Sequence, residues 1–198
     1  LAERYGCSRT YDSLEAVLAD DEVEAVAIFS GAPDHAPHVV ATLEAGKHAF
    51  CAVPACMTLE EAEMLVEVKE RTGLRYMMAE TSYYQWETIL ARFMVQAGSF
   101  GELVYTEGEY YHPLGPAERE SLWFFRGKRT WRYGFPPIHY PTHSTAFLTG
   151  VTGERITRIA CLGWGDGSDW TRDNAYGNPF ANQVALALTD HGHAFRCN

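Results

Sequence analysis

The stretch VEAVAIFSGAPDHAPHVVATLEAGKHAFCA, Val23–Ala52, decides the fold of this chain. Its first residues, 23–29, are mainly apolar, which is typical of a strand buried in a parallel sheet. The next segment opens with Pro33 and Asp34, continues with helical periodicity and ends at Gly46. A second apolar strand follows at about His48–Ala52. The stretch therefore predicts a β-α-β unit.

The neighbouring segments extend this unit. Thr58 and Glu61 form a capping box ahead of an amphipathic helix that ends at Gly73, and residues 74–79 predict a third strand. Earlier in the chain, Ser13 is a good N-cap for a short helix. Strands and helices that alternate over such short connections form a parallel sheet with right-handed crossovers.

Ligands of a parallel sheet bind beyond the carboxyl ends of its strands. In this sequence those ends are residues 30–34, 52–54 and 80–84. We therefore expect three loops side by side at one edge of the sheet.

The pattern changes after Gln85. Residues 86–98 predict an amphipathic helix, and residues 101–112 alternate like a strand of a half-exposed antiparallel sheet. Residues 113–137 are rich in aromatic, basic, Gly and Pro residues and have weak periodicity, which indicates an irregular loop region that could fold over a ligand. The segments after it are a helix near 142–148, a strand near 155–163, a turn region at 163–179 and a last strand.

The fold class expected is α/β, with two domains. Residues 1–81 are predicted to be the C-terminal part of a Rossmann-type, dinucleotide-binding domain with a parallel sheet. Residues 82–198 are predicted to be part of an α+β substrate and oligomerisation domain with an open, mainly antiparallel sheet.

Composition limits the classes of partner. The chain has 16 Lys and Arg against 26 Asp and Glu, a formal net charge of -10, which argues against a nucleic acid or an anionic membrane as partner. No apolar run is long enough to span a bilayer. Its 5 cysteines are scattered and form no C-x-x-C pair, so no disulfide framework or zinc ribbon is predicted, and Cys51 and Cys56 are expected to act as small apolar side chains.

The sequence starts without Met and stops inside a strand pattern, so we expect a piece of a longer protein. The expected location is the cytoplasm, and export stays open because a leader could precede Leu1.

With these segments placed, the chain resembles the Gfo/Idh/MocA family of NAD(P)-dependent sugar enzymes. The resemblance covers essentially the whole chain and is carried by residues 20–81 and, more weakly, by HYPTHSTAFLTG, residues 139–150. In that family a T-P-N-x-x-x-H-like turn lies beside the cofactor, and the matching turn is Ala32–His38. The resemblance implies NAD or NADP as cofactor, a sugar or polyol as substrate, and a homo-oligomer when the protein is complete.

One motif departs from the family. Its E-K-P motif supplies a lysine near the nicotinamide, and the aligned residues are Ala52, Val53 and Pro54. Neither Ala52 nor Val53 can titrate, so another group must take the hydroxyl proton when a hydride leaves. A VP in place of KP is similar to the NAD-dependent glycosidases of the same superfamily, which oxidise a sugar hydroxyl transiently, acidify the neighbouring C–H, eliminate the aglycone and return the hydride.

Three hypotheses follow. The first is an NAD(P)-dependent oxidoreductase that acts on a carbohydrate. The second is a redox-assisted glycoside hydrolase or lyase that retains NAD. The third is a non-catalytic homologue that binds a nucleotide or a sugar.

The catalytic candidates are His143, Tyr83 and Glu80. By the resemblance, His143 is an inward-facing histidine and the proton acceptor, although a buried structural histidine would fit the same pattern. Glu80 and Tyr83 follow the third strand at the ligand edge, where they could assist, or Glu80 could pair with an arginine while Tyr83 packs.

The cofactor candidates come from the first two strand ends. They are Ser30, Pro33, Asp34, His38, Val53 and Pro54. Asp34 could also act only as a helix cap.

The substrate candidates are cationic and aromatic residues, which suit sugar stacking and hydroxyl recognition. They are Lys128, Trp131, Arg132, His139 and Tyr140. His139, which replaces the family's usual aspartate, is four residues before His143, a spacing that zinc can use, but Pro141 between them argues against a shared helix face, and no metal is predicted.

Overall fold

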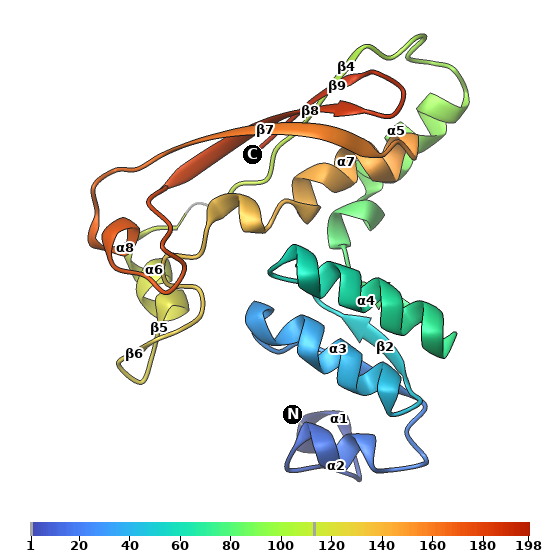
Figure 1. The fold of residues 1–198 in the computed structure, drawn as a ribbon, viewed down its shortest axis with the longest axis vertical. Coiled ribbons are helices and arrows are strands. Elements are labelled where there is room, and N and C mark those ends of the chain that lie inside the picture. Colours follow the sequence, from blue (N-terminus) through green and yellow to red (C-terminus); the bar gives the residue numbers. More distant parts are fainter. Residues whose placement is uncertain (1, 113) are drawn as a thin grey trace. The chain divides into compact units, whose positions relative to one another are not determined.

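The computed structural model describes residues 2–112 and 114–198, which form two compact units, 2–79 and 80–198 (Figure 1). Leu1 and Pro113, the first residues of two predicted segments, lie outside the described residues. Among the residues described, no helix combines the length and the apolar character needed to cross a bilayer. The roles expected of the two domains stay predictions.

The first unit contains a parallel sheet of three strands. They are β1 (Ala25–Ile28), β2 (His48–Cys51) and β3 (Tyr76–Met78), in the order β1-β2-β3. The helices α3 (His35–Glu44) and α4 (Leu59–Thr72) connect consecutive strands, as the sequence predicts. Two short helices precede β1, α1 (Ala2–Tyr5) and α2 (Leu14–Leu18).

A compact core joins α3 and α4 to the sheet. Its buried side chains are Ile28, Ala36, Val39, Leu43, Ala49, Cys51, Leu65 and Val68. Cys51 is fully buried, and burial raises the pKa of its thiol to about 11, so Cys51 is a core residue as expected.

The predicted caps of α2 and α4 are present, but the predicted cap of α3 is not. Thr58 Oγ1 accepts a hydrogen bond from Glu61 N (3.1 Å), and Gly73 ends α4 with a φ of 66°. Asp34, by contrast, makes no capping bond: it belongs to a 3-10 turn, η1 (Ala32–Asp34), and has φ -97° and ψ -5°. A capping side chain needs an extended backbone, so the helical backbone of Asp34 explains the failed prediction.

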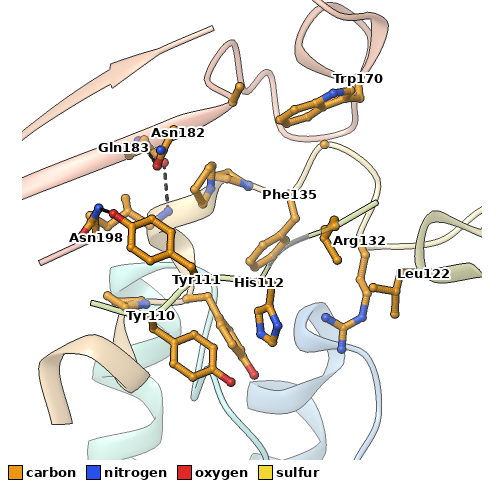
Figure 2. A pocket seen from close by; sticks show the side chains of 18 of the residues that line it. Tyr110, Tyr111, His112, Leu122, Arg132, Phe135, Trp170, Asn182, Gln183 and Asn198 are labelled. Carbon is orange, nitrogen blue, oxygen red and sulfur yellow. Dashed lines mark hydrogen bonds between the residues drawn. The ribbon is translucent and has the colours of Figure 1, made fainter. Parts of the chain in front are cut away.

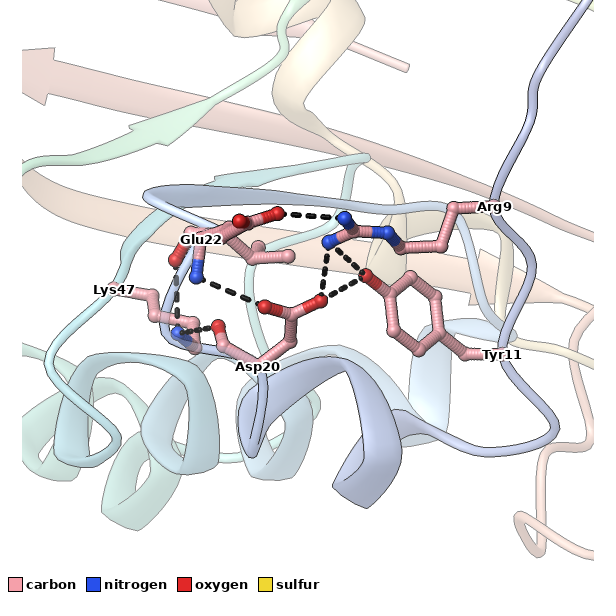
Figure 3. A network of polar contacts seen from close by, with 6 residues as sticks. Arg9, Tyr11, Asp20, Glu22 and Lys47 are labelled. Atoms are coloured by element: carbon pink, nitrogen blue, oxygen red, sulfur yellow. Dashed lines mark hydrogen bonds and ion pairs between the residues drawn. The ribbon is translucent and has the colours of Figure 1, made fainter.

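A buried lysine holds the start of the sheet (Figure 3). Lys47 is 5% exposed, and its Nζ donates to the carbonyl oxygens of Asp20 and Val23, both at 2.8 Å. On the solvent side, the guanidinium of Arg9 pairs with Asp20 and Glu22, each at 2.6 Å. Lys47 thus fixes the turn before β1 against the turn before β2.

The second unit is built on a four-stranded sheet in the order β4-β9-β8-β7. Its strands are β4 (Tyr105–Gly108), β7 (Ile156–Trp164), β8 (Asn182–Thr189) and β9 (Ala194–Cys197). Helix α7 (Thr142–Thr152) packs on one face, over a core of Leu148, Ala185, Ala187, Phe195 and Cys197. The remaining elements are η2 (Thr81–Tyr84), α5 (Trp86–Gln96), α6 (Pro116–Trp123), β5 (Phe124–Phe125), β6 (Lys128–Arg129), η3 (Pro137–His139) and α8 (Asp169–Arg172).

The direction of β4 differs from the prediction. β4 is shorter than residues 101–112 and pairs parallel with β9, whereas β7, β8 and β9 are antiparallel to one another. Alternation reports which face of a strand is buried but not the direction of its neighbour. The fold class itself, α/β with a parallel sheet followed by a mainly antiparallel one, is confirmed.

Residues 114–137 are more regular than predicted. Pro116 opens α6 as its first residue, and β5 and β6 form a hairpin whose turn residues, Arg126 and Gly127, have φ of 51° and 73°. Two positive φ values in a tight hairpin turn are usually encoded by Asn-Gly or Asp-Gly. Arg-Gly is a weak signal for that turn, which is why the sequence did not reveal the hairpin.

Candidate functional site

A buried carboxylate–imidazole pair lies in the second unit. Glu80 precedes η2 and His143 lies in the first turn of α7, and Nδ1 of His143 is 2.6 Å from Oε1 of Glu80. The side chains of Glu80 and His143 are 9% and 5% exposed. The structure therefore unites two of the three predicted catalytic residues in one pair.

Neighbouring polar groups hold this pair in place. The backbone N–H of Ser82 donates to Glu80 Oε1 (2.7 Å), and the Ser82 hydroxyl is 3.3 Å from His143 Nδ1. Thr88, on α5, donates to the Ser82 carbonyl (2.7 Å) and fixes the short η2 turn. The Glu80 carboxylate can only accept, so Nδ1–H of His143 donates to it and Nε2 is left on the opposite side of the ring.

The carboxylate is held in its charged form. Burial raises the pKa of Glu80, but hydrogen bonds from His143, from the Ser82 N–H and from Thr142 lower it, and the net effect is a lowered pKa. A charged Glu80 fixes the orientation of the imidazole.

Aromatic rings surround His143. The ring of Tyr110, just beyond β4, lies 4.2 Å from the His143 ring at 34°, and that of Tyr140 lies 4.7 Å away at 78°. Both tyrosines line a neighbouring pocket, and His143 itself lies behind them.

This pocket has a volume of about 550 Å³, within the usual range of small-molecule sites (Figure 2). Its lining belongs entirely to the second unit. The aromatic and histidine side chains of the lining are Tyr110, Tyr111, His112, Trp123, Trp131, Phe135, Tyr140 and Trp170, and its amides are Asn182, Gln183 and Asn198. Flat apolar faces combined with amides are the surface that pyranose rings and their hydroxyls fit.

The two basic side chains of the lining, His112 and Arg132, lie close to each other on one side of the pocket (Figure 2). Burial lowers the pKa of His112, and the nearby His143 and Arg132 lower it further. His112 is therefore neutral at pH 7 and can accept a proton. Burial raises the pKa of Tyr140, which stays a hydrogen-bond donor.

Some polar atoms of the lining are unsatisfied within the described residues. Nε1 of Trp170 and Oδ1 of Asn198 are buried and have no hydrogen-bond partner there. Gln183, by contrast, accepts from Ile138 N (3.0 Å). A ligand with hydroxyl groups could satisfy a free donor and a free acceptor of this kind.

The predicted substrate residues separate into two groups. Trp131, Arg132 and Tyr140 line the pocket. Lys128 and His139 are not among the lining residues. Lys128 lies exposed in β6, and the ring of His139 packs against Phe135 (5.7 Å).

The third catalytic candidate, Tyr83, lies outside the pocket lining. Its ring is 4.2 Å from the Arg92 guanidinium and touches α7 at Gly150, where an added Cβ would come within 2.7 Å of it. This position matches the packing alternative considered for Tyr83. In the same alternative Glu80 would pair with an arginine, but its partner is His143.

The sequence prediction missed Tyr110 and His112. Both follow β4 in the segment EGEYYH, residues 107–112, which was assigned only to a strand. The signal was the clustering of two tyrosines and a histidine directly after a strand.

In the first unit, a buried histidine joins two of the predicted loops. Nδ1 of His35 is 2.7 Å from the carbonyl oxygen of Pro54, and its Nε2 is 3.0 Å from that of Ser30. The loops that follow β1 and β2 are therefore side by side, as expected for two of the three loops, whereas residues 80–84 belong to the second unit. Ser30 and His38 also meet, at 3.0 Å between Oγ and Nδ1.

The remaining cofactor candidates lie at the edge formed by the ends of β1 and β2. Pro33 lies in η1 beside Asp34, and Val53 and Pro54 follow β2. Val53 is 9% exposed, so its side chain is largely covered. This edge offers backbone groups and small side chains, with the hydroxyl of Ser30, the carboxylate of Asp34 and the imidazole of His38 as its polar groups.

The family model described as "Oxidoreductase family, NAD-binding Rossmann fold", that of Gfo/Idh/MocA, matches residues 1–80. The resemblance seen in the sequence is confirmed for this part of the chain.

Curated relatives match part of the chain. A "Glycosyl hydrolase family 109 protein" of Shewanella baltica is 40% identical over 98 residues, which are 50% of this chain and 21% of that protein. An "Alpha-N-acetylgalactosaminidase" of Shewanella oneidensis is 38% identical over 132 residues, 66% of this chain and 29% of that protein. The matched stretches thus span less than a third of these relatives.

Solved structures share the fold over nearly the whole chain. A myo-inositol 2-dehydrogenase from Lactobacillus plantarum has a TM-score of 0.78 at 17% identity and covers 99% of this chain and 56% of its own. An inositol dehydrogenase homolog from Azotobacter vinelandii, complexed with NADH and myo-inositol, has a TM-score of 0.71 at 22% identity and covers 93% of this chain and 46% of its own. The chain spans about half the length of these proteins.

Proposed function

Because residues 1–80 belong to the NAD-binding Rossmann fold of the Gfo/Idh/MocA oxidoreductase family, we propose that the complete protein is a redox-assisted glycoside hydrolase that retains NAD. The proposed substrate class is a glycoside, and an N-acetylgalactosaminide is the first member to test because one relative carries that name. This reverses the order of the first two hypotheses drawn from the sequence.

One observation carries the proposal. The aromatic pocket of the second unit has a neutral histidine, His112, and a buried Glu80–His143 pair beside its tyrosines, while the loop Ala52–Pro54 offers no lysine. Elimination next to a carbonyl needs a base for a C–H proton and a separate acid for the leaving group. Simple alcohol oxidation needs only one base. The two histidines of this site therefore fit an elimination better than they fit an alcohol oxidation.

The names of the relatives point the same way. The relatives that are 38% and 40% identical are named glycosidases, whereas the two inositol dehydrogenase structures described above are 17% and 22% identical. The dehydrogenases support the fold, and the glycosidases support the chemistry.

The loop edge of the first unit is the proposed site of the dinucleotide. His35 fixes the loops after β1 and β2, and the exposed groups there are small and uncharged apart from Asp34. Ser30, Pro33, Asp34, His38, Val53 and Pro54 remain the residues proposed to contact it. When bound, NAD would accept a hydride from a sugar carbon and later return it.

The residues of the second unit would move the protons. His112, neutral at pH 7, would accept a proton from the substrate. His143, oriented by Glu80 through Nδ1, would transfer a proton at Nε2 beside the rings of Tyr110 and Tyr140. Arg132 and the aromatic walls would orient the sugar.

A second candidate function is a carbohydrate oxidoreductase that exchanges its cofactor each turnover. It is favoured by the fold shared with inositol dehydrogenases. The two candidates differ in whether NADH accumulates.

We also propose that the complete protein is a homo-oligomer that uses the open face of the second sheet. On that face Leu162, Trp164, Leu186 and Leu188 are exposed. On β8, Leu186 and Leu188 alternate with Ala185 and Ala187, which pack in the core on the other face. Light scattering that finds a monomer would contradict this proposal. A cytoplasmic location stays a prediction.

The test is to incubate the complete protein with chromogenic glycosides and measure the aglycone and NADH together. Release of the aglycone without NADH supports the hydrolase. NADH formation from a free sugar without aglycone release would favour the oxidoreductase. If neither occurs and NAD still binds, the protein would belong to the non-catalytic class.

A further inference from the structure

A cluster of metal-binding side chains lies at the opposite end of the second sheet from the pocket. It consists of Glu154, just after α7, and of His191 and His193 in the turn between β8 and β9. The pocket uses Asn182 and Gln183 at the start of β8, and Thr189 ends that strand about 23 Å further on at the usual rise per residue. The cluster is therefore separate from the proposed site.

The spacing of the three side chains fits a tetrahedral metal. Glu154 Oε1 is 2.9 Å from His193 Nδ1 and 3.7 Å from His191 Nδ1, and a ligand atom of each residue lies within 4.8 Å of the others. Zinc–ligand bonds of about 2.0 Å at tetrahedral angles place ligand atoms about 3.3 Å apart. Both measured separations lie within about 0.4 Å of that value, so small side-chain movements would complete the geometry.

The buried carboxylate gives the second, independent indication of a ligand. The Glu154 side chain is 3% exposed, and its Oε2 is buried without a hydrogen-bond partner among the described residues. A buried charged oxygen with no partner is costly. A cation bound by this carboxylate would satisfy that oxygen or bring a water to it.

The backbone already holds the two loops in register. Arg155 N donates to Asp190 Oδ1 (3.0 Å), and Asp190 N donates to the Arg155 carbonyl (2.9 Å). The backbone N–H of His193 donates to Thr189 Oγ1 (3.1 Å), which shapes the turn between the strands. The ligands are thus preorganised before a metal binds.

The electrostatic surroundings suit a cation. The cluster follows the C-terminal end of α7, where the helix dipole favours positive charge and where the last turn carries no basic residue. The carboxylate of Asp190 lies beside His191, and Arg155 is the cationic residue of the same loops, with its backbone bound to Asp190. Two imidazoles and one carboxylate are ligands for zinc, whereas magnesium and calcium prefer oxygen ligands alone.

We propose that Glu154, His191 and His193 bind one Zn²⁺ ion, with water at the fourth position, and that this ion links the end of α7 to the turn between β8 and β9. The role is structural, because the cluster is separate from the proposed catalytic pocket.

The test is thermal unfolding of the complete, untagged protein after chelation, with and without added Zn²⁺, together with metal analysis after gel filtration. We expect one equivalent of zinc and a melting temperature that rises with Zn²⁺ concentration but not with Mg²⁺. Co²⁺ is expected to give the visible absorption of a tetrahedral site.

The decisive variant is His191→Ala, because His191 is 67% exposed and its loss should not unfold the metal-free protein. It should weaken Zn²⁺ binding more than about 100-fold, since even the loss of an outer-shell partner costs about 10–100-fold. The matched control is His48→Ala, an exposed histidine on β2 that should keep the full zinc response. Glu154→Gln, like His191→Ala, should remove the rise of the melting temperature with Zn²⁺.

No zinc-dependent stabilisation of the wild type would overturn the proposal. So would a response that His191→Ala and Glu154→Gln both retain, since that would place the metal elsewhere.

Discussion

Glu80→Gln is the substitution that most sharply tests the carboxylate–imidazole pair. Gln keeps the shape of the side chain but removes its charge. The carboxylate accepts from His143 Nδ1 (2.6 Å) and from Ser82 N (2.7 Å), and both bonds become neutral in the variant. A hydrogen bond to a charged group contributes about 1.5–3 kcal/mol and a neutral one about 0.5–1.5, so two such changes cost about 2 kcal/mol together.

The cost should depend on pH. The folded protein holds the pKa of Glu80 below its value in the unfolded chain, so the stabilisation is fully present above about pH 4.5 and is lost as the pH falls through the folded pKa. At pH 7 we expect the melting temperature of the second unit to fall by about 4–8 °C in Glu80→Gln. At acid pH the wild type and the variant should converge.

The assay is calorimetry from neutral to acid pH, with Glu102→Gln as the matched control. Glu102 is an exposed carboxylate of the same unit, and its change should stay within about 0.5 kcal/mol. The reasoning would be refuted by a Glu80→Gln variant as stable as the wild type at pH 7, or by a difference that persists unchanged in acid.

The other predictions concern three positions. Gly108→Ala should destabilise the second unit by about 3 kcal/mol or more, because the new Cβ would lie 2.2 Å from the backbone oxygen of Ser144. The control is Gly115→Ala, where the added Cβ meets only the flexible end of the Glu118 side chain. Equal urea midpoints for Gly108→Ala and Gly115→Ala would contradict this prediction. Lys47→Met should cost the first unit about 2–4 kcal/mol, because two carbonyl oxygens lose a charged donor; an unchanged urea midpoint would argue against that role. His143→Ala should lower kcat/KM by about 100-fold or more with cofactor affinity nearly unchanged, and a loss below tenfold would remove His143 from the mechanism.

Much of the first unit was predictable because its signals are local. The capping box of Thr58 and Glu61 and the glycine stop at Gly73 occur where the sequence placed them. Asp34 failed because a 3-10 turn precedes α3, and a capping residue type does not reveal the backbone conformation it will adopt.

The second unit was less predictable because its partners are distant in sequence. β4 pairs with β9, which lies at the far end of the chain, and no local pattern specifies that parallel pairing. The β5–β6 hairpin was not predicted for a different reason: Arg126 and Gly127 are an unusual residue pair for a tight hairpin turn.

The candidate site shows the same division. Glu80 and His143 could be named from the sequence, but their contact spans 63 positions and only the fold brings them together. Tyr110 and His112 were missed because the pocket lining comes from segments that are distant in the sequence and meet only in the folded protein. The Glu154–His191–His193 cluster could not be recognised in the sequence for the same reason, since β7, α8 and β8 separate Glu154 from the two histidines.

The most direct test of the central claim is to run the glycoside reaction of the complete protein in deuterated water and analyse the released sugar by mass spectrometry. Transient oxidation acidifies the neighbouring C–H, so we predict that deuterium enters the sugar at that carbon while the aglycone is released and no NADH accumulates. Release of the aglycone without deuterium at any carbon would contradict the redox-assisted mechanism.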